Sequence, residues 1–296
     1  MKLSHSPITK HTFAHIEFYL KRDDLLHPQF SGNKARKFMF LLQSELPKIN
    51  TIISYGSPQA NSLYSLAALC KLKGWTLEYY VERIPDWLRD KPIGNFGGAL
   101  KLGAKVIAVH DKSPHPLDFI QTVRNPDSSC LVIEEGGRER DAQHGIKGLA
   151  DEIVGWGQSQ KSNDFVVVLP SGTGTTSAYL QHFLKPYGIE VITCPCVGGK
   201  DYLINQIQSL NIQTLPQILQ LNNKHHFGKL YHNDYQTWKA LLEQTQVEFD
   251  LLYDPMMWQC LVDWHSHNRD KTILYIHQGG LLGNESMLPR YQRKFD

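Results

Sequence analysis

The chain has 296 residues, with 31 lysines and arginines, 29 aspartates and glutamates, and a formal net charge of +2 at pH 7. This balance gives no support for a nucleic-acid partner or a membrane surface, since both favour clustered positive charge. An apolar fraction of 41% is that of an ordinary globular protein. No secretory apolar core lies in residues 1–20 and no apolar run is long enough to span a bilayer, so we expect a cytoplasmic protein.

Short apolar runs alternate with helical patterns along the chain, which predicts an α/β protein with parallel-type sheets flanked by helices. The predicted strands, in chain order, are 51–55, 76–82, 105–110, 130–134, 165–169, 190–194 and 272–277. The predicted helices are 35–42, 61–73, 95–102, 145–156, 175–184, 200–210, 235–245 and 256–268. Gly74 and Gly103 mark the ends of two of these helices.

The basic segment Ser31-Gly32-Asn33-Lys34-Ala35-Arg36-Lys37 places one lysine, Lys34, between a small flexible pair and a helix-forming run. A lysine that forms a Schiff base must be partly desolvated and close to other cations that lower its pKa. We expect Arg36 and Lys37 to supply such cations. The alternative is an ordinary solvated basic face, because most lysines and arginines lie on protein surfaces.

A glycine-rich turn follows the predicted strand 165–169 and precedes a predicted helix. Glycines let the backbone approach a phosphate, and the N–H groups at a helix start point toward it. The turn is neither a Walker loop nor a complete dinucleotide fingerprint. A plain strand-to-helix turn is the alternative. The candidate phosphate ligands in this turn are Ser171, Gly172, Thr173, Gly174, Thr175 and Thr176.

Five segments occur in one order: 31–37, 54–61, 134–137, 171–176 and 277–280. With these segments, the chain resembles the pyridoxal-phosphate (PLP) enzymes related to 1-aminocyclopropane-1-carboxylate deaminase and D-cysteine desulfhydrase. This family belongs to the tryptophan synthase β-like group, fold type II. The resemblance extends from about residue 17 to about residue 283.

The resemblance implies a two-domain fold. A small α/β domain, 47–145, is inserted into a large cofactor-binding domain formed by 1–46 and 146–296. The cofactor lies in the cleft between them in such a fold. Relatives of this kind commonly form homodimers, so a homodimer is expected.

Roles within the site also follow from the resemblance. Lys34 matches the Schiff-base lysine, which also serves as the catalytic base, and Lys37 would reach the cofactor phosphate. Asn61 matches the asparagine that bonds the cofactor's phenolic oxygen, although a helix N-cap is the structural alternative. The substrate carboxylate would bind around Gln59, Ala60, Asn61 and Ser62.

Two further positions are expected to act on the substrate. Tyr253 is assigned an acid/base or substrate-orienting role, because a phenol near a cofactor can move protons. Tyr231 corresponds loosely to a second active-site tyrosine. A buried tyrosine bonded to a backbone carbonyl is the alternative for both.

Three departures from the family pattern bear on the reaction. Ala60 replaces a serine whose hydroxyl serves proton transfer or carboxylate binding in relatives. Pro255 and Met256 replace a Gly-Lys pair. Asp254 stands where deaminases carry glutamate and desulfhydrases threonine, and Gln278 where they carry leucine and threonine. Asp254 and Gln278 are expected to face the pyridine ring, where an acidic partner strengthens the electron sink.

The sequence therefore predicts a PLP-dependent lyase or deaminase that acts on a small amino acid, without a metal. The nearest activity is that of a D-cysteine desulfhydrase, which eliminates across the α and β carbons and releases a keto acid and ammonia. The alternatives are 1-aminocyclopropane-1-carboxylate deamination, amino-acid racemisation, or PLP binding with little catalysis.

Overall fold

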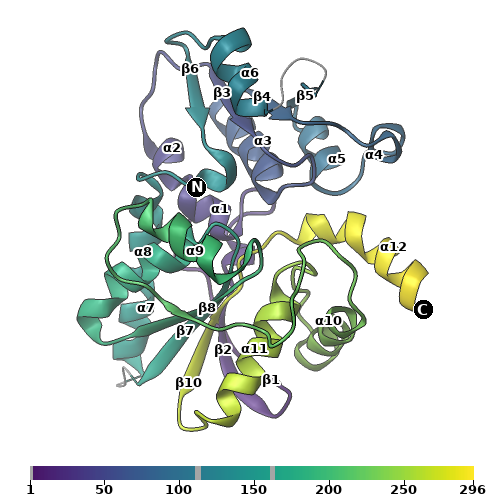
Figure 1. Ribbon diagram of the computed structural model, residues 1–296. Helices are drawn as coiled ribbons and strands as arrows, with labels where there is room; N and C mark the ends of the chain where they lie inside the picture. Colours follow the sequence, from purple (N-terminus) through teal and green to yellow (C-terminus); the bar gives the residue numbers. More distant parts are fainter. Residues whose placement is uncertain (1–2, 111–114, 161–163) are drawn as a thin grey trace.

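The computed structural model describes residues 3–110, 115–160 and 164–296. Within them, ten strands form two separate sheets of six and four strands. Figure 1 shows the two sheets in two parts of the molecule, one above the other, with helices packed on their faces.

The six-stranded sheet has the order β1-β2-β10-β7-β8-β9, and all its pairings except β1 with β2 are parallel. Its strands are β1 (Ile8–Phe13), β2 (Ile16–Lys21), β7 (Phe165–Ser171), β8 (Glu190–Pro195), β9 (Gln217–Ile218) and β10 (Thr272–Ile276). A central parallel strand is covered on both faces and reads as a continuous apolar run. The run in β7 fits this description, because every one of its residues is buried.

Helices cover both faces of this sheet (Figure 1). Val166 and Val168 pack toward the cluster built from α10, α11 and α12, while Val167 and Leu169 pack toward the cluster of α7, α8 and α9. Successive side chains of one strand thus fill two cores. The helices are α7 (Ala142–Ser159), α8 (Thr175–Leu184), α9 (Gly199–Gln208), α10 (His232–Thr245), α11 (Asp254–Ser266) and α12 (Asn284–Phe295).

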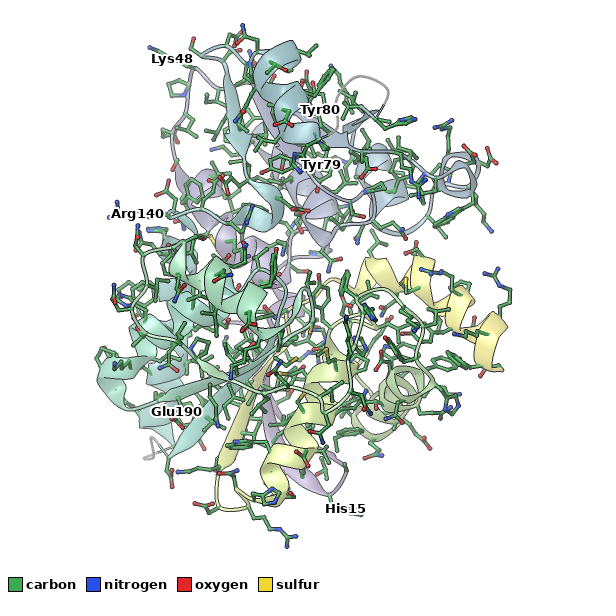
Figure 2. All side chains as sticks on the ribbon, viewed as in Figure 1. His15, Lys48, Tyr79, Tyr80, Arg140 and Glu190 are labelled. Atoms are coloured by element: carbon green, nitrogen blue, oxygen red, sulfur yellow. The ribbon has the colours of Figure 1, made fainter. Side chains whose placement is uncertain are left out.

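The four-stranded sheet is parallel throughout, in the order β5-β4-β3-β6. Its strands are β3 (Thr51–Tyr55), β4 (Thr76–Val81), β5 (Lys105–Ala108) and β6 (Cys130–Ile133). Figure 2 places Tyr79 and Tyr80 of β4 in the interior of this upper part, and both are buried. The accompanying helices are α3 (Asn61–Lys73), α4 (Asp86–Asp90), α5 (Gly94–Lys101) and α6 (Pro116–Phe119).

Two short helices, α1 (Gly32–Lys37) and α2 (Met39–Gln43), connect the two parts. Ala35 of α1, Phe38 between the two helices and Leu41 of α2 are buried in one core with Ile52 and Leu66. The sequence prediction assigned residues 1–46 to the large domain, whereas these side chains pack in the core of the four-stranded sheet. The proposed domain limits remain a prediction.

Fold class and most elements agree with the sequence. The α/β class with parallel sheets is confirmed. The predicted bounds of β3, α3 and α8 match the structure residue by residue. The β1–β2 hairpin and helix α12 were not predicted. None of the described helices combines the length and apolar character that crossing a bilayer requires.

Candidate active site

The loops that follow four parallel strands meet between the two sheets. They come after β3, β6, β7 and β10, and each begins at the carboxyl end of its strand. Gly136, after β6, lies beside Thr173, after β7: a Cβ on Gly136 would be 3.2 Å from the Thr173 methyl. Ligands of open α/β sheets bind at such strand ends. Helix α1, which carries Lys34, enters the same region, since the Asn33 N–H donates to the Gln278 carbonyl at 3.1 Å.

Lys34 has the properties of a reactive lysine. Burial lowers the pKa of its amine to about 8, and the Asp250 carboxylate opposes this shift. Among the described residues, we find no hydrogen bond or ion pair of the Lys34 amine. A desolvated, partly neutral amine without a protein partner can act as a nucleophile or a base.

Arg36 does not serve as the expected neighbouring cation of Lys34. Its guanidinium points away, into a buried cluster where it donates to Asp23 at 2.8 and 2.9 Å and to Glu152 at 2.7 and 2.9 Å. Lys21 completes this cluster and donates to Glu152 at 2.6 Å. The positive charge of Arg36 is thus neutralised within the protein. Burial, rather than this arginine, lowers the pKa of Lys34.

Lys37 lies on the phosphate side of the site. Its amine donates to the Gly136 carbonyl at 2.9 Å and contacts the Thr173 hydroxyl at 3.4 Å. Burial lowers its pKa well below the usual range, and the positive charges of Lys34 and Arg138 lower it further. Arg138 also has a buried Nε without a hydrogen-bond partner among the described residues. This crowding of cations would be relieved by an anion.

The glycine-rich turn divides into two functional parts. The Ser171 hydroxyl lies 2.7 Å from that of Thr193 and 2.8 Å from that of Ser177, so it belongs to the hydrogen bonds that join β7, β8 and α8 rather than to an open phosphate site. Thr176 differs, because its hydroxyl is buried and has no partner among the described residues.

The remaining residues of the turn surround the N-terminus of α8. Gly174 is the N-cap in the left-handed conformation, at φ 74°, and provides no capping side chain. The hydroxyls of Thr173 and Thr175 lie 3.1 Å apart. Free amides at this helix start, the unpaired Thr176 hydroxyl and the Lys37 amine form a donor set suited to a phosphate. The residues present therefore fit the phosphate group of PLP.

Asn61 and Asp250 join the two sheets next to Lys34. The Asn61 amide donates to Asp250 at 3.1 Å, and its oxygen accepts from the Asn95 amide at 2.7 Å. Asn61 is the first residue of α3 and Ala60 is the N-cap, so the structural alternative for Asn61 is wrong. Asp250 was not predicted, and nothing in its local sequence marks it.

The predicted carboxylate site lies at the start of α3. Ala60, the N-cap, makes no side-chain hydrogen bond to the first amides of the helix. The Gln59 carbonyl accepts from Asn95 at 2.9 Å, which fixes the turn. The Ser62 hydroxyl is buried against the Tyr79 hydroxyl at 3.3 Å. The Gln59 and Ala60 amides donate to the hydroxyl and the carbonyl of Ser57, at 3.2 and 3.1 Å. Among the described residues the Asn61 and Ser62 amides have no acceptor, so these two N–H groups, rather than the Ser62 hydroxyl, are available to a carboxylate.

Tyr253 lies over the glycine-rich turn. A Cβ on Gly172 would be 3.6 Å from its hydroxyl, and burial with the nearby Asp250 raises the pKa of the phenol. Phe227 covers it, with ring centroids 5.2 Å apart.

Tyr231 does not join this group. Its hydroxyl accepts from the His226 N–H at 3.0 Å and its ring stacks on His225 at 4.4 Å. The structure therefore places Phe227, not Tyr231, beside Tyr253. Phe227 is followed by Gly228 in a polar loop, and this pair forms no sequence motif that would have predicted its place in the site.

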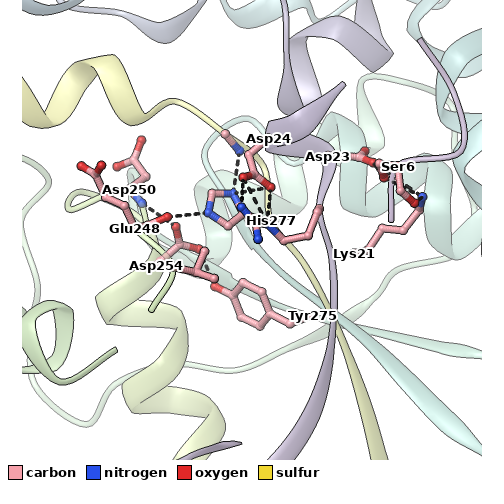
Figure 3. Close-up of polar contacts among 12 residues, drawn as sticks. Ser6, Lys21, Asp23, Asp24, Glu248, Asp250, Asp254, Tyr275 and His277 are labelled. Carbon is pink, nitrogen blue, oxygen red and sulfur yellow. Dashed lines mark hydrogen bonds and ion pairs between the residues drawn. The ribbon is translucent and has the colours of Figure 1, made fainter. Parts of the chain in front are cut away.

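Asp254 begins α11 and is buried behind Tyr253. Its two carboxylate oxygens accept from the Tyr275 hydroxyl at 2.6 Å and from the Asp250 N–H at 2.9 Å (Figure 3). Burial, and next the charge of Asp250, raise its pKa to about 8. Both oxygens are thus engaged within the protein, and the expected contact with the pyridine ring remains a prediction.

Gln278 and His277 follow β10. The Gln278 amide donates to the Pro170 carbonyl at 2.7 Å, which ties β10 to the end of β7. His277 is fully buried, accepts from the Gly279 N–H at Nδ1 and faces the Glu248 carbonyl at Nε2, 2.7 Å away (Figure 3). This pattern requires a neutral ring with its proton on Nε2. Burial lowers the pKa of His277 accordingly.

Two surface hollows lie elsewhere. One, of about 640 Å³, is lined by Phe40, His144 and Phe183 among others, and the second, of about 560 Å³, adjoins Lys21 and Glu152. Neither is lined by any of the predicted site residues. The chemistry-bearing groups lie instead at the strand ends described above.

Comparison with known proteins agrees with this geometry. No family model matches the chain. The D-cysteine desulfhydrase of Serratia proteamaculans is 28% identical over 291 residues, which cover 89% of this chain and 86% of that protein. A crystal structure of a 1-aminocyclopropane-1-carboxylate deaminase homologue superposes with a TM-score of 0.81 at 19% identity, over 99% of this chain and 95% of the other. The chain is similar to members of the deaminase and desulfhydrase family.

The predicted resemblance to this family is thereby confirmed. The fold is also that of a pyridoxal 5'-phosphate-dependent aspartate racemase, with a TM-score of 0.65 at 14% identity over 93% of this chain and 90% of the other. At these low identities the solved structures show the fold, and the roles of individual residues rest on the geometry.

Proposed function

We propose that this protein is a PLP-dependent lyase that acts on a small amino acid and releases a keto acid and ammonia. A D-cysteine desulfhydrase-like elimination is the favoured reaction. The carrying observation is the Lys34 amine, which is desolvated, has a pKa of about 8 and lies beside a phosphate-sized donor set that includes Lys37. The family relationship supports the same class of reaction.

Different residues would bind the cofactor, bind its phosphate and move the proton. Lys34 would hold the cofactor through its amine, and the α8 N-terminus with Lys37 and Thr176 would hold the phosphate. When bound, PLP withdraws electrons from the carbon that carries the substrate nitrogen. The Lys34 amine would be the base that takes the proton from that carbon.

Carboxylate binding would use backbone rather than a hydroxyl. Ala60 cannot donate a hydrogen bond, but the uncapped amides at the start of α3 lie at the positive end of a thirteen-residue helix. The Tyr253 phenol stays protonated because its pKa is raised, so it can donate a hydrogen bond or a proton to a leaving group. We therefore expect substrate binding to tolerate the loss of the family serine.

The test is turnover by the purified chain reconstituted with PLP. We expect hydrogen sulfide and pyruvate from D-cysteine, and their absence with Lys34→Ala. Release of 2-oxobutanoate from 1-aminocyclopropane-1-carboxylate, or inversion of an amino acid without a keto acid, would replace elimination by one of the alternatives. Bound cofactor without turnover of any D- or L-amino acid would contradict the lyase proposal.

Assembly and location are separate expectations. A homodimer in the cytoplasm is proposed by analogy with the family alone. Light scattering coupled to size-exclusion chromatography would give twice the 33.9 kDa chain mass for a dimer. A mass of one chain would contradict the expected dimer while leaving the proposed reaction unaffected.

A further inference from the structure

We propose that Arg138 is a further binding residue for the phosphate of the cofactor. Its guanidinium is held at Nη1 by Gln206 and offers the other edge, formed by Nε and Nη2, to an oxyanion. The choice of the cofactor phosphate as that oxyanion rests on the proposed function, whereas the oxyanion site itself does not.

The Nε–Nη2 edge of an arginine binds a carboxylate or a phosphate through two parallel hydrogen bonds. Two other arginines of this chain use that edge for a neighbouring aspartate. Arg22 donates to Asp24 at 2.9 and 2.7 Å. Arg36 donates to Asp23 at 2.9 and 2.8 Å. The same edge of a third arginine is therefore expected to have an acceptor of its own.

In Arg138 this edge has no acceptor among residues 3–110, 115–160 and 164–296. Its Nε is buried without a hydrogen-bond partner, and the exposed Glu134 carboxylate lies 3.7 Å from Nη2, too far for a hydrogen bond. The Arg138 side chain is only 25% exposed. A positive charge with so little contact with water and no close counter-charge is costly, and an oxyanion would remove that cost.

The opposite side of the guanidinium is fixed. The Nη1 of Arg138 donates to the side-chain oxygen of Gln206 in α9. This bond crosses from the loop after β6 to a helix that covers the six-stranded sheet. A side chain held in this way loses little further freedom when its other edge binds a ligand.

The loop that carries Arg138 is packed against the phosphate side of the site. The Gly136 carbonyl accepts from the Lys37 amine at 2.9 Å, and a Cβ on Gly136 would be 3.2 Å from the Thr173 methyl. A Cβ on Gly137 would be 3.5 Å from the Lys37 side chain. The two residues before Arg138 thus contact a lysine and a threonine that are expected to bind the phosphate.

Gln206 approaches the same glycine-rich turn from α9. Leu203 and Ile207 of that helix lie against Gly174, where a Cβ would be 2.5 and 3.1 Å from their side chains. Gly174 is the N-cap of α8, the helix whose first amides are expected to bind the phosphate. The Arg138–Gln206 bond therefore joins two segments that both contact this turn.

The experiment compares two aldehydes that differ only in the phosphate group. The full chain, freed of any cofactor with hydroxylamine, is titrated with PLP and with pyridoxal, and both dissociation constants are measured from the absorbance of the bound aldehyde. We expect Arg138→Gln to weaken PLP binding by about tenfold or more, as for lost hydrogen bonds to a charged group. Pyridoxal binding should change by less than about twofold, because pyridoxal has no phosphate for the arginine to bind.

Arg140→Gln is the matched control, because it removes the same charge from an exposed side chain at the edge of the molecule (Figure 2). It should leave both dissociation constants within about twofold. Gln206→Met keeps the arginine but removes the oxygen that holds Nη1, and should weaken PLP binding by about threefold. It replaces Arg138→Gln if that variant does not fold. Equal losses for PLP and pyridoxal in the folded variant, or no loss for either, would overturn the inference.

Inorganic phosphate separates this inference from the proposed function. Its binding to the cofactor-free chain, measured by isothermal titration calorimetry, should weaken by about tenfold in Arg138→Gln. That result in a chain that binds no PLP would support the oxyanion site and remove the proposed function. Tight PLP binding that is equal in the wild type and in Arg138→Gln would do the reverse.

Discussion

Thr176 and Thr193 are two buried threonines near the end of β7 with opposite hydrogen-bonding states. The Thr193 hydroxyl lies 2.7 Å from both the Leu169 carbonyl and the Ser171 hydroxyl, whereas the Thr176 hydroxyl has no partner among the described residues. A buried unpaired hydroxyl costs free energy that a ligand can recover. This difference separates a binding residue from a structural one.

Thr176→Val should therefore improve stability and impair binding. Replacing the unpaired hydroxyl should leave the free energy of unfolding unchanged or raise it by up to about 1 kcal/mol, and lost bonding to a charged phosphate should weaken PLP binding about tenfold. Thr193→Val should do the opposite, with a loss of about 1–2 kcal/mol in stability and unchanged affinity. Urea unfolding and fluorescence titration with PLP measure the two quantities. Equal affinities for PLP would rule out Thr176 as a ligand.

The raised pKa of Asp254 should make the free energy of unfolding depend on pH. Its pKa is raised to about 8 in the folded chain, against about 3.9 in an unfolded one. The folded state therefore holds an extra proton between these values, so stability falls as pH rises through this range, by at most about 1.4 kcal/mol per pH unit. Asp254→Asn, which resembles the protonated carboxyl group, should flatten the dependence between pH 5 and pH 8, roughly the same window. A slope unchanged from the wild type in urea unfolding would contradict this assignment.

At the scale of elements, α1 is held in place from the side opposite Lys34. Arg36 of α1 and Lys21 of β2 share the Glu152 carboxylate of α7, and all three side chains are nearly inaccessible to solvent. The neighbouring Asp151 forms an exposed ion pair with Lys147 at 2.8 Å. Adjacent residues of α7 thus form a buried ion pair, through Glu152, and an exposed one, through Asp151.

Glu152→Gln should lower the free energy of unfolding by roughly 3 kcal/mol, because two buried cations lose a shared carboxylate and only Asp23 remains to balance them. Asp151→Asn should change it by less than about 0.5 kcal/mol. The pKa of Glu152 is lowered to about 2, so its contribution to the free energy of unfolding is lost as pH falls from about 4 toward 2. The stabilities of the wild type and of Glu152→Gln should therefore converge in this pH range. Similar losses in both variants at neutral pH would contradict a buried cluster that anchors α1.

The elements predicted correctly are those whose ends are marked by residues in the local sequence, such as a glycine at a helix end. Helix α3 ends at Gly74 in the left-handed conformation, and the glycine-rich turn marks the start of α8. The β1–β2 hairpin lacked such a signal, since its two turn residues, Ala14 and His15, have φ values of 49° and 63° without being glycine or asparagine. Helix α12 contains Pro289, a residue that normally indicates a helix boundary.

The site was only partly predictable for the same reason. Lys34, Lys37 and the 171–176 turn could be proposed from the sequence because short motifs contain them, and their roles remain predictions. Asp250 and Arg36 have roles set by partners 189 and 116 positions away, Asn61 and Glu152 respectively. No local pattern encodes such contacts, so only the fold reveals them.

At the scale of the whole molecule, the Asn61–Asp250 bond joins parts of the chain that belong to different sheets. Gly280, at φ 86°, lies against this bond, since a Cβ there would be 2.5 Å from the Asn61 amide nitrogen and 2.6 Å from an Asp250 oxygen. Gly103 has a similar φ of 91° and open space around it. Alanine at either position should lower the free energy of unfolding by about 1 kcal/mol, because a side chain is strained in the left-handed backbone conformation. Gly280→Ala should lose at least about 1 kcal/mol more, because its Cβ forces the buried pair apart. Equal losses in thermal or urea unfolding would show that the junction tolerates the side chain.

The central claim is that this chain binds PLP through Lys34. The most direct measurement is borohydride reduction of the chain loaded with PLP, followed by peptide mass spectrometry to locate the attached pyridoxyl group. The account predicts one pyridoxyl group per chain, on Lys34, and none at that site in Lys34→Ala. Attachment spread over surface lysines, or a specific adduct on another residue, would contradict it.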